Sequence, residues 1–169
     1  MKKFNIGSLF CHFYILILIL SYFSHGLNTF IKFMILITGT FLVTYILLEL
    51  KKLLNKKCSI KNLNFFIYSF IFLEFFSVFQ FLLPLITTKN TPNFSIYILV
   101  VSVILQFLFA SLILKANFKK IKFLTVYGYS LFVSGFFSLF FPASFINIFL
   151  PIAVTFILGE IFFEGANLV

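Results

Sequence analysis

Long apolar runs and short polar connections alternate along this chain of 169 residues. Each run has close to the ~20 apolar residues that one helix needs to cross the hydrocarbon core of a bilayer. The connections carry Lys, Asn, Thr, Ser and Pro, which interrupt the apolar runs. We therefore predict six transmembrane helices, at about residues 6–23, 29–50, 65–86, 95–114, 121–141 and 145–162.

This pattern predicts an all-α fold, a polytopic bundle of transmembrane helices. No tandem repeat or low-complexity linker divides the chain, so we expect one integral membrane domain over residues 1–169. An alternative concerns the first run, because Met1-Lys2-Lys3 followed by apolar residues also resembles a signal peptide. Its removal would leave five spans.

The lysines are distributed unevenly between the two sets of alternating connections. Two precede the first run, five lie between the second and third runs, and four surround the end of the fourth run. The other set of connections has only Lys32 and Lys89. Because cytoplasmic connections retain positive charge, this division predicts that both the N-terminus and the C-terminus are cytoplasmic. We expect the cell membrane of a prokaryote in preference to an endomembrane.

Composition narrows the function classes. Apolar residues make up 62% of the chain and its mean hydropathy is +1.17, which excludes a soluble domain of any size. The net charge of +9 comes from lysines scattered between apolar runs, so we expect no nucleic-acid partner. The chain has no Asp, and no metal-ligand or nucleophile motif occurs. We expect no enzymatic activity, no metal and no cofactor.

One acidic residue lies near the middle of a predicted span. Glu74 is in the third run, where an acidic side chain costs roughly 2.5 to 3.5 kcal/mol. Ser77 and Gln80 follow it at helical spacing, and Gln106 lies at about the same depth in the fourth run. We expect these side chains to face protein. If Glu74 is protonated, it can donate a hydrogen bond to the Gln106 amide oxygen.

Two interpretations of Glu74 remain open. It can be a proton or cation site, as in secondary transporters, or a neutral packing residue that is hydrogen-bonded to its neighbours. No second acid, His or Lys is expected at its depth, which favours the packing interpretation.

Small residues recur at helical spacing in the last two predicted spans. Such stripes let helix backbones approach closely in lipid. Because only residues 142–144 join the two spans, we expect an antiparallel hairpin packed along the stripes. The helix-packing residues are Ser130, Ser134, Gly135 and Ser138 in the fifth span, and Thr155 and Gly159 in the sixth.

The connection after the second run mixes lysines with Leu and Ile and is able to lie along the inner leaflet. Each lysine near an anionic surface contributes about 1 kcal/mol to binding. The alternative is a solvated connection that only sets the orientation of the spans. The candidate contacts to anionic lipid are Lys51, Lys52, Lys56, Lys57 and Lys61.

The segment Phe118-Lys-Lys-Ile-Lys-Phe-Leu-Thr-Val-Tyr-Gly-Tyr-Ser130 resembles the Yip family of polytopic membrane proteins, which includes Rab-interacting trafficking proteins. It is similar to that family's cytoplasmic loop and the span that follows, and the resemblance covers about residues 96–160. It implies a role in membrane organisation, trafficking or scaffolding, with the lipid bilayer and other membrane proteins as partners. The alternatives from the residues themselves are a small-solute or ion transporter that uses Glu74, and an accessory subunit of a larger membrane complex.

Overall fold

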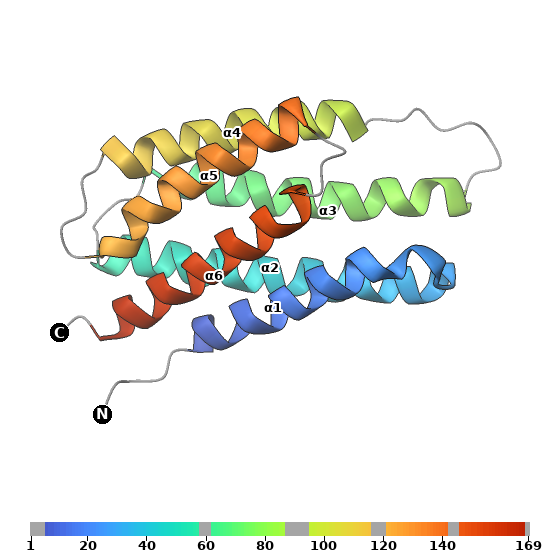
Figure 1. The fold of residues 1–169 in the computed structure, drawn as a ribbon, viewed down its shortest axis with the longest axis horizontal. Helices are drawn as coiled ribbons and strands as arrows, with labels where there is room; N and C mark the ends of the chain where they lie inside the picture. The colour runs from blue at the N-terminus through green and yellow to red at the C-terminus, as the bar shows by residue number, and fades with distance from the viewer. Residues whose placement is uncertain (1–5, 58–61, 87–94, 116–120, 142–145, 168–169) are drawn as a thin grey trace.

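A computed structural model of the chain describes residues 6–57, 62–86, 95–115, 121–141 and 146–167 (Figure 1). All regular elements in these ranges are helical. They are α1 (Ile6–Phe23), the 3-10 turn η1 (Ser24–Gly26), α2 (Thr29–Lys57), α3 (Asn64–Ile86), α4 (Ser95–Lys115), α5 (Lys122–Phe140) and α6 (Ile146–Ala166). The six α-helices are long and apolar enough to cross a membrane. The prediction of an all-α fold with six spans is confirmed, and the protein is a multi-pass membrane protein.

The helix at residues 29–57 departs most from the prediction. It continues seven residues beyond Leu50, so Lys51 to Lys57 prolong α2 and form no separate segment along the membrane. Its 29 residues span about 43 Å, which exceeds the ~30 Å hydrocarbon core. The charged end of α2 therefore projects beyond the apolar layer as helix. Similarly, α6 continues four residues beyond the predicted end at Phe162.

Each helix packs against the helices next to it in sequence, and α1 closes the arrangement by packing against α6. Of the six interfaces that form this closed arrangement, the most extensive are α4–α5, α1–α6 and α5–α6, and the least extensive is α3–α4. The first turn of α1 and the last turn of α6 lie at the same end of the bundle (Figure 1). We call this the lysine-rich end, because it also holds Lys51, Lys52, Lys56, Lys115 and Lys122; the other end is the opposite end.

Close helix contacts form where large side chains lie over glycines. A Cβ atom on Gly128 of α5 would lie 2.9 Å from Leu114 of α4, and one on Gly135 would lie 2.7 Å from the Phe107 ring. The two glycines are seven residues apart and face one helix, so they set the antiparallel register of α4 and α5. Between α1 and α6, Gly7 lies under the Phe162 ring in the same way.

Buried residues are concentrated in the lysine-rich half. In α3, no described residue after Ile67 is buried, and in α6 none before Thr155 is buried. The end of α5 and the start of α6 also stop short of the opposite end, where α3 and the α1–α2 pair project further (Figure 1). The main hydrophobic core consists of Cys11, Ile46, Leu47, Leu50, Leu54, Leu63, Ile67, Phe109, Ala110, Ile113, Ile121, Leu124, Tyr127, Leu131, Leu158, Ile161 and Phe162.

The glycine contacts predict a position-specific effect on stability. Gly128→Leu forces bulk against Leu114, and overpacking of this kind costs about 1–3 kcal/mol or more. We expect the thermal unfolding midpoint of the purified protein in detergent to fall. Gly26→Leu is the matched control, because a side chain at Gly26 meets nothing within 4 Å. Equal midpoints for the two variants would show that the α4–α5 contact does not hold the bundle together.

Candidate functional site

A layer of polar side chains crosses the bundle at the boundary between the packed half and the loosely packed half. Each helix contributes one member, and three of them are almost fully buried: Thr40, Ser134 and Thr155 are 4%, 7% and 7% exposed. The remaining three are partly buried. We call this set the polar layer; its members are Tyr14, Thr40, Glu74, Gln106, Ser134 and Thr155.

Contacts between α1 and its neighbours place three members at one depth. The Tyr14 ring lies 3.8 Å from the position of a Cβ atom on Gly39, the residue before Thr40. On the other side of α1, the His12 and Phe156 rings meet with their centres 6.3 Å apart, and Phe156 follows Thr155. Tyr14, Thr40 and Thr155 therefore lie within about one helical turn of each other along the membrane normal.

Contacts of α4 place the other three members. The Phe70 ring of α3 meets the Phe109 ring of α4 with centres 5.6 Å apart. Because α3 and α4 are antiparallel, Glu74 and Gln106 each lie about one turn from this contact in the same direction. Gln106 Nε2 in turn donates a hydrogen bond of 3.1 Å to the Leu131 carbonyl oxygen, one turn before Ser134 of α5.

The side chain of Glu74 faces the interior of the bundle. It lies seven residues from Ile67, which is buried in the core, and seven from Phe81, which stacks on Phe33 of α2. Residues seven apart share one helix face. Tyr14 of α1 lies within electrostatic range of Glu74. Within the described part of the chain, no hydrogen bond or ion pair reaches the Glu74 carboxylate.

Most other polar groups near this depth are satisfied locally. Thr40 Oγ1 donates 3.0 Å to the Leu36 carbonyl oxygen, and Thr155 Oγ1 donates 2.7 Å to that of Pro151. Ser77 Oγ donates its hydrogen to the Leu73 carbonyl oxygen at 2.9 Å, so this hydrogen is not shared with Glu74. One turn from Thr40, the buried Thr44 Oγ1 has no hydrogen-bond partner among the described residues.

The structure brings Glu74 and Gln106 to the same depth but does not join them. The amide nitrogen of Gln106 is directed to the α5 backbone, because Gly135 lets α5 approach α4 closely while α3 packs on α4 least extensively. Gln80, on the same helix as Glu74, is partly buried closer to the opposite end. Sequence reasoning did not identify Tyr14 as a neighbour of Glu74; the only sign was a tyrosine deep in an apolar run.

The expected packing stripes of α5 and α6 face other helices. Gly135 lies under Phe107 of α4, and a Cβ on Gly159 would lie 3.4 Å from Cys11 of α1. Ser134 and Thr155 are buried, and Ser138 is partly buried. The Ser130 hydroxyl donates to the Tyr127 carbonyl oxygen of its own helix. The α5–α6 hairpin does form. Asn147 Nδ2 fastens it at the turn by donating 2.5 Å to the Phe141 carbonyl oxygen.

Of the five candidate lipid-contacting lysines, the three whose side chains are described, Lys51, Lys52 and Lys56, do not form one patch. Lys51 donates to the Tyr68 hydroxyl of α3 and lies 4.5 Å above that ring. Lys52 pairs with Glu49 at 2.5 Å, and Lys56 is exposed on the same face of α2. Lys57 is the last residue of α2, and Lys61 lies outside the described residues.

Glu164 has a structural role at the lysine-rich end. Its two carboxylate oxygens accept hydrogen bonds from the backbone N–H groups of Lys122 and Phe123, at 3.1 and 3.2 Å. These residues open α5, whose own N-cap residue, Ile121, offers no side-chain acceptor. A carboxylate from α6 thus caps α5 and complements its dipole. In the described residues, no three of His, Cys, Asp and Glu come together as metal ligands do.

Loss of this cap has a defined consequence. Glu164→Ala leaves two N–H groups of α5 without acceptors and is expected to lower the free energy of unfolding by about 1 kcal/mol. Glu160→Ala, one turn earlier on α6, removes the same group without touching α5 and serves as the control. Unfolding in detergent, followed by circular dichroism, measures both. A loss no larger for Glu164→Ala than for Glu160→Ala would contradict the capping role.

Comparison of the chain with protein-family models, with curated proteins and with solved structures finds no match. The resemblance of residues 96–160 to the Yip family therefore stays a prediction.

Proposed function

We propose that this protein binds a proton or a small cation at Glu74 and carries it across the membrane, alone or as a subunit of a transporter. The observation that carries the proposal is the interior-facing carboxylate of Glu74 in the polar layer, with no hydrogen bond or ion pair from the described residues.

The carboxyl group of Glu74 lies near the middle of its span. An ionised side chain near the middle of a bilayer costs several kcal/mol unless it is paired or neutralised. The hydroxyl groups of Thr40 and Thr155 donate to backbone carbonyls, and the bond that Gln106 donates goes to the Leu131 carbonyl oxygen, so none of these three bonds reaches Glu74. A bound proton or cation would neutralise Glu74, so binding and stabilisation of the bundle are coupled at this position.

The surroundings of Glu74 suit a small positive ligand. Tyr14 lies within electrostatic range of Glu74, and a tyrosine hydroxyl oxygen and ring face both attract cations. No described lysine lies on the interior face of α3, since Lys51 and Lys52 are held by Tyr68 and Glu49 at the lysine-rich end. Lys32 of α2 is partly buried about two turns from Thr40 toward the opposite end, so the ligand would pass a positive group before it meets the negative group at the depth of Glu74.

The difference in packing between the two halves of the bundle indicates from which end a ligand would enter. The polar layer borders the loosely packed half, so a ligand would reach Glu74 from the opposite end. Passage to the lysine-rich side would require the packed half to open. The α2–α3 and α3–α4 interfaces are the two least extensive of the six around the bundle, which makes α3, the helix that carries Glu74, the element best suited to move.

Transport in vesicles tests the proposal. Purified protein is reconstituted into liposomes that contain a dye sensitive to H⁺, Na⁺ or K⁺, and an inward gradient of the ion that the dye reports is imposed. We expect flux above that of protein-free vesicles for the unmodified chain, because Glu74 can bind and release the ion. Glu74→Gln removes the charge at nearly constant volume and should reduce flux to the protein-free level.

Glu160→Gln is the matched control, because it makes the same chemical change on α6 away from the polar layer. Its flux should equal that of the unmodified chain. Flux that persists in Glu74→Gln would remove this carboxyl group from the mechanism.

A second candidate is the non-enzymatic role in membrane organisation, trafficking or scaffolding that the Yip resemblance implies. It is favoured by the exposed face of α3, where aromatic side chains recur at spacings of three and four, as in a helix-packing seam. This seam consists of Phe65, Tyr68, Phe72, Phe75 and Phe79. Vesicles that show no flux for any gradient would favour this role, or that of an accessory subunit, over transport by the chain alone.

A further inference from the structure

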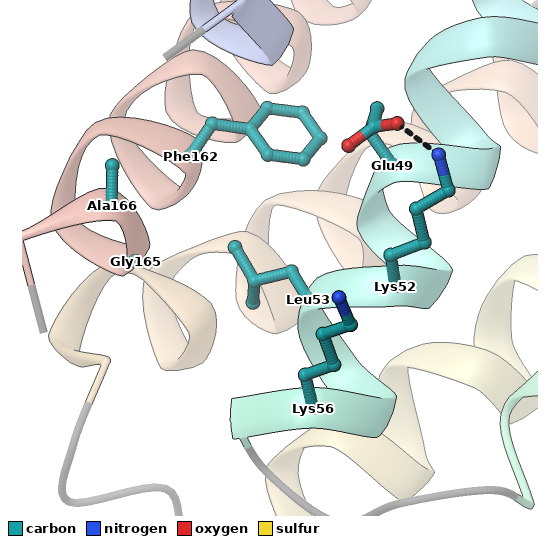
Figure 2. A pocket seen from close by; sticks show the side chains of 7 residues that line it. All are labelled: Glu49, Lys52, Leu53, Lys56, Phe162, Gly165 and Ala166. Atoms are coloured by element: carbon teal, nitrogen blue, oxygen red, sulfur yellow. Dashed lines mark hydrogen bonds and ion pairs between the residues drawn. The ribbon is translucent and has the colours of Figure 1, made fainter. Parts of the chain in front are cut away.

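A pocket of about 200 Å³ lies at the lysine-rich end between the last turns of α2 and α6 (Figure 2). One side is polar and comes from α2, where Glu49, Lys52 and Lys56 line it. The other side is apolar and comes from Phe162, Gly165 and Ala166 of α6, toward which the Leu53 side chain of α2 points. The pocket is open to its surroundings at the level where α2 projects beyond the hydrocarbon core.

The charged side of the pocket carries one net positive charge. Lys52 and Lys56 are four residues apart and share one face of α2. Figure 2 shows the Lys52 ammonium group turned to Glu49 and the Lys56 ammonium group beside Leu53. Lys52 donates to Glu49 Oε1 at 2.5 Å, and its side chain is 62% exposed. In the described part of the chain, no carboxylate pairs with Lys56. A singly charged anion would balance the three groups.

The apolar side depends on Gly165. A Cβ atom there would lie 2.5 Å from Leu53 Cδ1, so only glycine lets Leu53 and the end of α6 come together. Their contact forms a wall that continues to the Phe162 ring, which is 1% exposed. The pocket thus joins two ammonium groups to an apolar wall at the depth of the lipid headgroups.

We propose that this pocket binds the headgroup of one anionic phospholipid. Its phosphodiester, which has one negative charge, lies between Lys52 and Lys56. To bind it, Lys52 leaves its exposed ion pair with Glu49 and donates to the phosphate oxygens instead. The glycerol and first acyl carbons lie against Leu53, Phe162 and Ala166. A soluble phosphate has no apolar group that could pack against this wall, whereas a phospholipid does. The wall therefore favours a lipid as the source of the anion.

Native mass spectrometry of the protein in detergent tests the site, with phosphatidylglycerol, phosphatidylcholine or inorganic phosphate added. We expect the first phosphatidylglycerol to bind roughly thirtyfold more tightly than phosphatidylcholine, the scale expected for two lysine contacts. The double variant Lys52→Gln/Lys56→Gln should abolish this preference. Ala166→Leu, which fills the pocket and keeps its charge, should weaken the binding of phosphatidylglycerol as well.

The matched control is Lys115→Gln/Lys122→Gln, which removes two exposed lysines from the same end of the bundle but outside the pocket. It should keep the preference for phosphatidylglycerol. Equal losses in the two double variants would show diffuse attraction to the charged end and overturn the proposal. Inorganic phosphate that binds alone and displaces phosphatidylglycerol one for one would reassign the pocket to a soluble anion and also overturn it.

Discussion

Close approach of helix backbones at glycine is the interaction on which the rest of this structure depends. Within a bilayer, apolar side chains gain little by leaving lipid for protein, so association of the helices needs van der Waals contact at short range. Leu114 over Gly128, Phe107 over Gly135 and Phe162 over Gly7 provide it. All three contacts join neighbouring helices of the closed bundle.

The positions of these contacts explain why the two halves of the bundle differ. Gly7, Gly128 and Gly159 lie towards the lysine-rich end, and Gly135 lies at the polar layer. In the opposite half, Phe33 of α2 and Phe81 of α3 meet ring on ring, with their centres 6.4 Å apart. Glu74 therefore lies where tight packing ends, with protein on one side and a loosely packed region on the other.

The spans could be predicted from the sequence because length and hydropathy alone decide whether a segment crosses a bilayer. The inward direction of Glu74 followed equally from the energetic cost of a carboxyl group in lipid. The neighbours of individual residues could not be predicted. Gly135 and Gly159 were expected to join α5 to α6, yet they face α4 and α1, because periodicity identifies a helix face but not the helix it meets.

The same limit applies to polar partners. The bond from Gln106 to the Leu131 carbonyl oxygen and the cap that Glu164 provides for α5 both join residues more than twenty positions apart. No short sequence motif predicts either of these two interactions. The extension of α2 was missed for a different reason, since its lysines resemble a connection although Leu54, which is 1% exposed, is part of the core.

We expect the polar layer to divide the bundle into a packed half and a half that small solutes can enter from the opposite end. Thiol accessibility tests it most directly, in a background where Cys11 and Cys58 are replaced by alanine. Ser77→Cys and Ile67→Cys place thiols on α3 on either side of Glu74, and a small, positively charged thiol reagent is added from the opposite end. We expect Ser77→Cys to react and Ile67→Cys to remain unmodified. Equal reaction at both positions, or reaction at Ile67→Cys alone, would contradict the claim.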